Sequence, residues 1–167
     1  MKSLSKALFA FYLLILLWLI IFKFSFNLSS ILDYQTRSIN LIPFAFANER
    51  GNLREIIYNF VVFIPFGLLL SVNFKKATFR KKLASVFVFS LTAEISQFVF
   101  AIGATDITDL ITNTFGGFLG LILYDLCNKY INNQKLDRFI VFVGILLLVL
   151  FILLCILLFN VNYRSAR

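Results

Sequence analysis

The hydrophobic positions of the chain fall into five long runs that are separated by polar segments. Each run approaches the roughly 20 residues that an α-helix needs to cross the hydrocarbon core of a bilayer. Lipid offers no partner to backbone polar groups, so such runs predict helices, which satisfy these groups internally. The sequence therefore predicts an all-α, polytopic membrane helix bundle that forms one domain over residues 1–167. The expected transmembrane spans cover about residues 7–26, 56–74, 83–102, 107–126 and 139–159.

The composition agrees with a membrane protein and excludes an ordinary soluble domain. Hydrophobic residues make up 60% of the chain and charged residues only 14%, which is far more apolar than a globular domain can bury. The first run follows Lys2 and Lys6 like the start of a signal peptide. It is long for one and lacks a convincing cleavage site, so we expect an uncleaved anchor. The last run carries no charge, which predicts a lipid-facing helix at the edge of the bundle.

The net charge of +8 is best explained by topology. Short loops on the cytoplasmic side of membrane proteins are enriched in lysine and arginine. The basic residues lie between the apolar runs and form no stripe interleaved with exposed aromatics, so we expect no nucleic-acid partner. This pattern predicts a cytoplasmic N-terminus. The residues that set the orientation are Lys2, Lys6, Lys75, Lys76, Arg80, Lys81, Lys82, Lys129, Lys135 and Arg138.

The residue types that are missing narrow the possible chemistry. The chain has no histidine and two cysteines, Cys127 and Cys155, whose positions suit neither a disulfide framework nor a zinc site. Ser-His and Cys-His catalytic pairs are therefore absent, as are most transition-metal sites. Any chemistry must use carboxylates, amides, hydroxyls or arginines, and we expect no cofactor and no metal.

The third expected span places Ser90, Glu94 and Gln97 along one helical face, with spacings of four and three residues. Glu94 is the most informative residue, because a carboxyl group at membrane depth is expensive unless it is protonated, paired or hydrated. One interpretation is a functional group. The other is a neutral glutamic acid that bonds to Gln97 or to the next helix.

The fourth expected span places Asp106, Asp109 and Asn113 on one face. In a structural interpretation, Asp106 is the N-cap of the helix and Asp109 is the N3 residue of a capping box. In a functional interpretation, the same groups face a ligand. A tight turn at Gly103 would place Glu94 and Asn113 at a similar depth, about 13–15 Å from the turn at 1.5 Å per residue, so these two side chains can meet.

The long first loop and the start of the second span carry further polar groups. Residues 40–44, Asn-Leu-Ile-Pro-Phe, are typical of a turn that dips aromatic groups into the membrane interface. Arg37, just before this turn, either anchors the loop at lipid headgroups or recognises a ligand. Asn59 opens the second span and Pro65 predicts a bend in it.

With this topology, the polar groups converge on the external side and the outer half of the membrane. A pocket open to the outside would suit an amphiphilic ligand of the outer leaflet, such as an isoprenoid-linked or sugar-bearing envelope precursor. The candidate ligand-binding residues are Arg37, Asn40, Asn59, Glu94, Gln97, Asp106, Asp109 and Asn113.

The order and spacing of these residues resemble the VanZ-like family of bacterial membrane proteins, over about residues 37–124. The most specific block is Asp106-Ile-Thr-Asp109-x-x-x-Asn113-Thr-x-Gly116. Relatives often carry an arginine just ahead of this block, where this chain has Ala104 and Thr105. The resemblance implies a multi-pass protein of the bacterial cell membrane with a role in the envelope. The namesake of the family is associated with resistance to teicoplanin, a lipid-anchored glycopeptide antibiotic.

Three functions remain open at this point. The first is recognition of a lipid-linked cell-wall precursor or a lipoglycopeptide, which the sequence favours because it offers no activated nucleophile. The second is a membrane enzyme acting on polyprenyl phosphate or pyrophosphate, with Glu94, Asp106 and Asp109 holding Mg²⁺ or acting as acid and base, and with Arg37 clamping phosphate. The third is a small transporter in which Glu94 is a proton-coupled gate.

Overall fold

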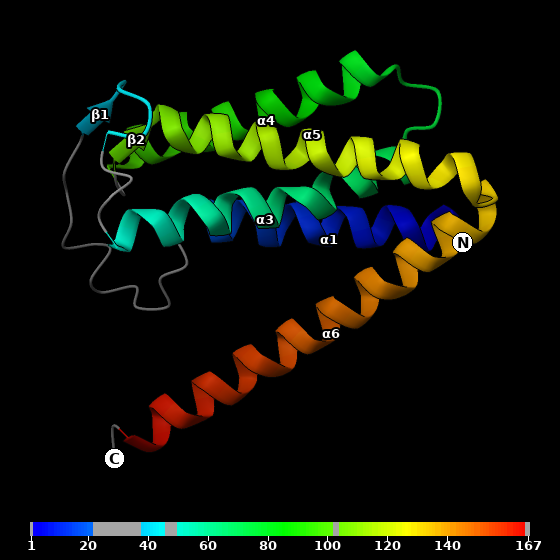
Figure 1. Ribbon diagram of the computed structural model, residues 1–167. Coiled ribbons are helices and arrows are strands. Elements are labelled where there is room, and N and C mark those ends of the chain that lie inside the picture. Colours follow the sequence, from blue (N-terminus) through cyan, green and yellow to red (C-terminus); the bar gives the residue numbers. More distant parts are fainter. Residues whose placement is uncertain (1, 22–37, 46–49, 102–103, 166–167) are drawn as a thin grey trace.

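The computed structural model describes residues 2–21, 38–45, 50–101 and 104–165 (Figure 1). Within these residues the chain forms long helices and one short ribbon of two strands. In chain order the elements are α1 (Lys2–Ile21), β1 (Ser38–Asn40), α3 (Arg50–Asn73), α4 (Phe79–Phe100), β2 (Ala104–Asp106), α5 (Ile107–Tyr130) and α6 (Asn133–Ser165).

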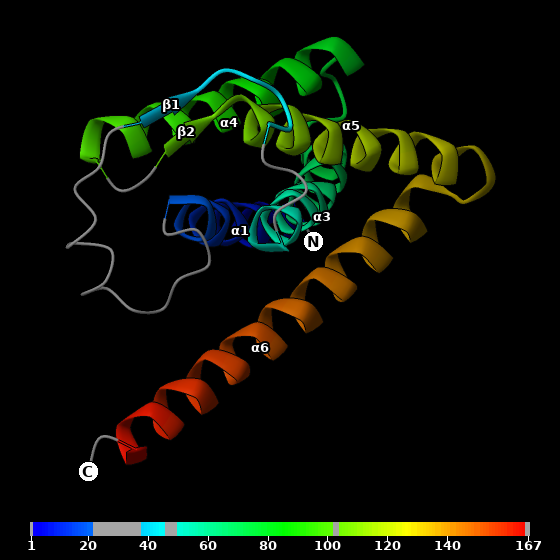
Figure 2. The same cartoon turned by 60° about the vertical axis from the view of Figure 1, so that its left-hand side comes forward.

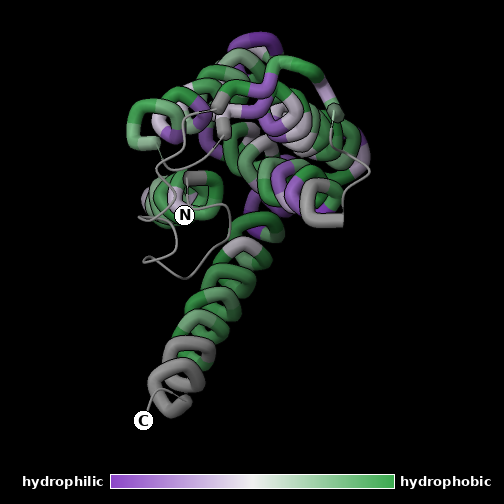
Figure 3. The backbone as a smooth tube through the Cα atoms, turned by 90° about the vertical axis from the view of Figure 1, so that its left-hand side faces the viewer, coloured by the Kyte–Doolittle hydropathy of each residue, from purple (hydrophilic) through white to green (hydrophobic). Residues whose placement is uncertain are grey.

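All five described helices are long and apolar enough to cross a membrane. This confirms the prediction of an all-α, polytopic bundle. Hydrophobic residues cover most of the length of the helices, and α6 is almost continuously apolar after its polar first turns (Figure 3). The helices extend past several of the expected spans, because polar end residues such as Lys2 and Asn133 continue the helical hydrogen bonding beyond the apolar run.

Helices α3 and α5 form the central pair of the bundle, and glycines bring their backbones into contact. A Cβ atom added to Gly120 would lie 2.1 Å from the carbonyl oxygen of Ile64, and one added to Gly67 would lie 2.2 Å from that of Gly117. Small residues allow this approach in membranes, where packing drives helix association. Helices α1 and α4 pack against this pair, around fully buried side chains such as Phe63.

Helix α6 leaves the bundle soon after it begins. In two views it diverges from the other helices toward its C-terminal end (Figures 1 and 2). Only 6% of the residues in its most apolar stretch are buried inside the bundle. Near its start, Leu136 and Val141 are buried in a cluster with Leu8, Leu69 and Tyr124. The predicted position of this helix at the edge of the bundle is thus confirmed.

Helix α3 runs continuously through Pro65 from Arg50 to Asn73. Proline lacks the N–H that would bond the carbonyl four residues earlier. In the turn before Pro65, the hydroxyl of Tyr12 on α1 donates a hydrogen bond to the carbonyl of Val62. A side chain from a neighbouring helix therefore contributes to the hydrogen bonding of this part of α3.

The two ends of the bundle differ in chemistry. The α3–α4 connection, the start of α1 and the α5–α6 turn share one end, and the β1–β2 ribbon lies at the other (Figure 1). The first end carries the lysines and arginines that predict the cytoplasmic side, so the same rule predicts that the ribbon faces outward.

A turn follows β1 at the ribbon end, as the sequence predicts for residues 40–44. The N–H of Ala45 donates to the carbonyl of Ile42, and Phe44 adopts a positive φ of 58°. Leu41 and Ile42 are 71% and 68% exposed. These apolar side chains face outward from the turn, which suits insertion into the membrane interface.

Candidate ligand-binding site

The site is built around Asp106, the N-cap of α5. Its Oδ1 accepts a hydrogen bond of 2.8 Å from the N–H of Thr108, which confirms the expected cap. The expected capping box is wrong, however. The N–H of Asp106 donates to Oε2 of Glu94 at 3.0 Å, so the reciprocal bond comes from α4 rather than from Asp109 in the first turn of α5.

The way the chain reverses between α4 and α5 explains why Glu94 takes the place predicted for Asp109. Ala101 ends α4 in a left-handed conformation (φ 54°), and its N–H caps the carbonyls of Gln97 and Phe98. The extended residues of β2 then pack against α4. There the hydroxyl of Thr105 donates to the carbonyl of Glu94 at 3.1 Å. Helix α5 therefore begins level with Glu94.

Strand β1 pairs with β2 and so lies beside the start of α5. The strands are parallel, with Asn40 opposite Asp106. The side-chain amide of Asn40 donates to Oδ2 of Asp106 at 3.1 Å, so both carboxylate oxygens of Asp106 are engaged. The N–H of Phe44 donates to the hydroxyl of Thr108 at 3.0 Å. Asn40, Glu94 and Asp106 are thus brought together, as the sequence predicts.

Asn113 and Gln97 contact other partners. The Nδ2 of Asn113 donates to the hydroxyl of Ser90 at 3.0 Å, rather than meeting Glu94 as expected. The physical reason is that β2 runs alongside α4 before α5 begins, which moves Asn113 deeper, to the level of Ser90. The Nε2 of Gln97 donates to the carbonyl of Ile20 at 2.9 Å, which ties α4 to the end of α1.

Oε1 of Gln97 and Oδ1 of Asn113 are buried acceptor atoms in this region that have no hydrogen bond to the described residues. Buried acceptors of this kind are uncommon and usually bind water or a ligand. Glu94 and Asn113 are 1% and 0% exposed. The candidate site is therefore a buried region that can accept further hydrogen bonds.

The other candidate residues lie close to the same end. Asn59 on α3 and Asp109 on α5 are buried, with 3% and 5% exposure. Arg37 falls outside the described residues. In the described part of the chain, no three histidine, cysteine or acidic side chains come together in a way that could hold a metal ion.

An apolar hollow of about 280 Å³, which we call the outer hollow, lies between α3, α5 and the turn after β1. Its one hydroxyl-bearing residue, Thr112, precedes Asn113 in α5. The hollow therefore lies beside the same part of α5 that carries Asn113. It is lined by Phe44, Ile56, Ile57, Phe60, Ile111, Thr112 and Phe115.

Sequence reasoning missed the roles of Thr105 and Thr108. The hydroxyl of Thr105 donates a hydrogen bond to α4 at the chain reversal, and the hydroxyl of Thr108 accepts a hydrogen bond from the N–H of Phe44. The ribbon was also missed, because strands of three residues are too short to show alternation. A threonine at the start of a helix is a weak signal for such contacts, since it often bonds to local backbone.

Replacing Asp106 with alanine is expected to lower the free energy of unfolding by about 1–2 kcal/mol, the usual effect of losing an N-cap. Asp106→Ser keeps the cap and should stay within about 0.5 kcal/mol of wild type. Denaturant titration of the purified protein in detergent measures both values. Equal losses in the two variants would show that the bond to Asn40, rather than the cap, carries the stability.

Comparison with known proteins identifies the family. A family model described as VanZ/LLP1 matches residues 9–128, which is more than half of the chain. The chain belongs to the VanZ/LLP1 family. A protein of Enterococcus faecium named Protein VanZ is 61% identical over 149 residues, which cover 89% of this chain and 91% of the relative. No solved structure matches this chain.

The extent of the VanZ/LLP1 match agrees with the fold. It includes the described candidate residues, from Asn40 to Asn113, and it ends near the C-terminus of α5. Helix α6, which diverges from the bundle, lies beyond it. The resemblance noted from the sequence is thereby confirmed, and the VanZ/LLP1 part of the chain coincides with the four-helix bundle and its ribbon.

Proposed function

We propose that this chain is an envelope protein of the bacterial cell membrane that recognises a lipid-linked cell-wall precursor or a lipoglycopeptide at the outer leaflet. We further propose that it contributes to resistance to teicoplanin-type glycopeptides. The observation that carries the proposal is Glu94, a carboxyl group with 1% exposure inside a membrane-spanning helix. Ionisable groups at such positions are costly and generally serve function.

The polar side of the proposed site is supported by the acceptors around Glu94. Oε1 of Gln97 and Oδ1 of Asn113 are buried and make no bond to the described residues. The hydroxyl and amide groups of a sugar–peptide precursor are donors that would satisfy them. No activated nucleophile is required for such binding, so recognition explains these groups without a reaction.

The apolar side of the proposed site is the outer hollow. Six of its seven lining residues are aliphatic or aromatic, so it suits a hydrocarbon chain better than a sugar. The polar region and the hollow together fit an amphiphile. The positive-inside rule predicts that this end of the bundle faces outward, where lipid-linked precursors and glycopeptides meet the membrane.

The test is binding of the purified, detergent-solubilised protein to undecaprenyl phosphate, a lipid-linked cell-wall precursor and teicoplanin. We expect saturable binding of at least one of them, and a loss of at least about tenfold in Glu94→Gln and Asp109→Asn, as for removal of a hydrogen bond to a charged group. The matched control is Asp125→Asn, which changes an exposed carboxylate near the opposite end of α5.

Absence of binding, with both site variants merely less stable than wild type, would show that the polar groups are structural and would end the proposal. Recovery of chemically altered undecaprenyl phosphate would replace recognition with the enzyme hypothesis. Proton-coupled flux in vesicles that depends on Glu94 would instead favour the transporter. In cells, expression of the wild type should raise the teicoplanin concentration needed to stop growth, and Glu94→Gln should not.

A further inference from the structure

The divergence of α6 leaves a groove between α1, α3 and α6. The body of this groove is a hollow of about 370 Å³ whose lining is almost entirely apolar. It includes Ile15 from α1, Pro65 from α3, and Val143 and Leu147 from α6. We call the whole feature the α6 groove. Its body lies at membrane depth, because all three helices are candidate spans.

The mouth of the α6 groove is strongly basic. A cavity of about 540 Å³ is lined by Lys2, Lys6, Lys75 and Lys76, with Asp137 as its one acidic residue. Four lysines and one aspartate leave a formal excess of three positive charges. Helices α1 and α6, which both contribute residues to the mouth, begin at this end, and the N-terminal end of a helix favours anions.

The mouth and the body follow one another along the same helices. On α1, Ser5 lines the mouth and Leu8, one turn later, lines the body. On α3, the corresponding residues are Val72 and Leu69. The two hollows are therefore neighbours along the same helices, one basic and one apolar, with the buried side chains of Leu8, Leu69 and Val72 packed together at their boundary.

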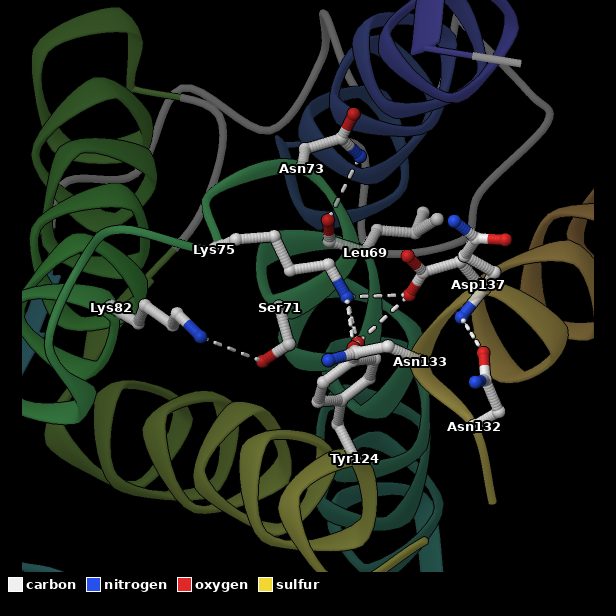
Figure 4. Close-up of polar contacts among 10 residues, drawn as sticks. Leu69, Ser71, Asn73, Lys75, Lys82, Tyr124, Asn132, Asn133 and Asp137 are labelled. Carbon is white, nitrogen blue, oxygen red and sulfur yellow. Dashed lines mark hydrogen bonds and ion pairs between the residues drawn. The ribbon is translucent and has the colours of Figure 1, made fainter. Parts of the chain in front are cut away.

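Lys75 has a fixed position at the mouth. Its ammonium group lies 2.6 Å from Asp137 and 2.9 Å from the amide oxygen of Asn133, and it also bonds to the hydroxyl of Tyr124 (Figure 4). It lies 4.4 Å from the centre of the Tyr124 ring. This cluster joins the end of α3 to the start of α6. The other three lysines of the mouth have no ion pair with the described residues.

We propose that the α6 groove binds an anionic phospholipid of the cytoplasmic leaflet, with its phosphate between the lysines and an acyl chain along the apolar body. Basic pockets between transmembrane helices at the cytoplasmic face suit anionic headgroups. Free phosphate would use the mouth alone, whereas a phospholipid accounts for the mouth and the body together. This proposal does not depend on the outer-leaflet site, which lies at the other end of the bundle.

The first experiment is native mass spectrometry of the purified full chain with palmitoyl-oleoyl phosphatidylglycerol or the corresponding phosphatidylcholine. Wild type should retain phosphatidylglycerol preferentially. Lys6→Gln/Lys76→Gln should weaken its binding about twenty-fivefold, since each basic side chain near an anionic headgroup contributes about fivefold. The matched control is Lys129→Gln/Lys135→Gln, which removes two exposed lysines at the same end but outside the mouth.

A second pair of variants tests the apolar body. Val143→Trp adds volume inside the α6 groove and should weaken phosphatidylglycerol binding, whereas Val149→Trp, at a position 46% exposed and outside the lining, should not. An excess of sn-glycerol 3-phosphate should fail to compete. Equal binding of the two lipids, equal losses in the two lysine pairs, or competition by sn-glycerol 3-phosphate would each overturn the proposal.

Discussion

Replacing Gly120 with alanine is expected to lower the free energy of unfolding by about 3 kcal/mol, at the top of the usual range for overpacking. The new Cβ atom would lie 2.1 Å from the carbonyl oxygen of Ile64. That atom belongs to the backbone of α3 and cannot move aside as a side chain can. The only relief is separation of α3 and α5, which would loosen the tightest contact of the bundle.

Gly144→Ala is the matched control on α6. Its added Cβ atom would lie 2.9 Å from Cδ2 of Leu8, the flexible end of a side chain. We expect a change below about 1 kcal/mol. Unfolding of both variants by denaturing detergent in mixed micelles measures the difference. Equal stabilities would contradict the close α3–α5 contact that the structure shows.

Replacing Glu94 with alanine is expected to destabilise the protein and to abolish ligand binding. The N–H of Asp106 would lose its acceptor, and an unsatisfied buried donor costs about 1–3 kcal/mol. The removed side chain, 1% exposed in the wild type, would also leave a cavity, which adds to the loss. The same unfolding titration, together with the binding assay, measures both effects.

Glu94→Gln separates these two roles. The amide oxygen of glutamine can still accept the bond from Asp106, so stability should stay within about 1 kcal/mol of wild type. If the site uses the carboxyl group for recognition, binding is lost in this variant all the same. A glutamine variant as unstable as the alanine variant would assign Glu94 a structural role.

The mouth of the α6 groove and the candidate ligand-binding site lie at opposite ends of one small bundle. The outer site is fixed by the ribbon and by the cap of α5, whereas the mouth of the groove is fixed by Lys75 and Asp137. Binding at one end can therefore be measured in variants of the other end. Independent losses in the two sets of variants would show that the sites are not coupled.

Several features of the site followed from local sequence. The spacing of Asp106 from the apolar run that follows it predicts an N-cap, and the structure has one. The hydrogen bond from Asn113 to Ser90 did not follow, because it depends on how far β2 runs along α4 before α5 begins. The same geometry explains why Glu94, rather than the predicted Asp109, accepts the hydrogen bond from the N–H of Asp106.

The sequence by itself determined the all-α class, the membrane-spanning helices and the lipid-facing position of α6. These features follow from the free energy of moving apolar side chains from water into lipid, which depends on composition and length along a single segment. Only the tertiary structure decided the partners of Glu94, Gln97 and Asn113 and the shape of the α6 groove. These depend on the relative depth and angle of separate helices, which are set by the close α3–α5 contact and by the chain reversal after Ala101 rather than by any one segment.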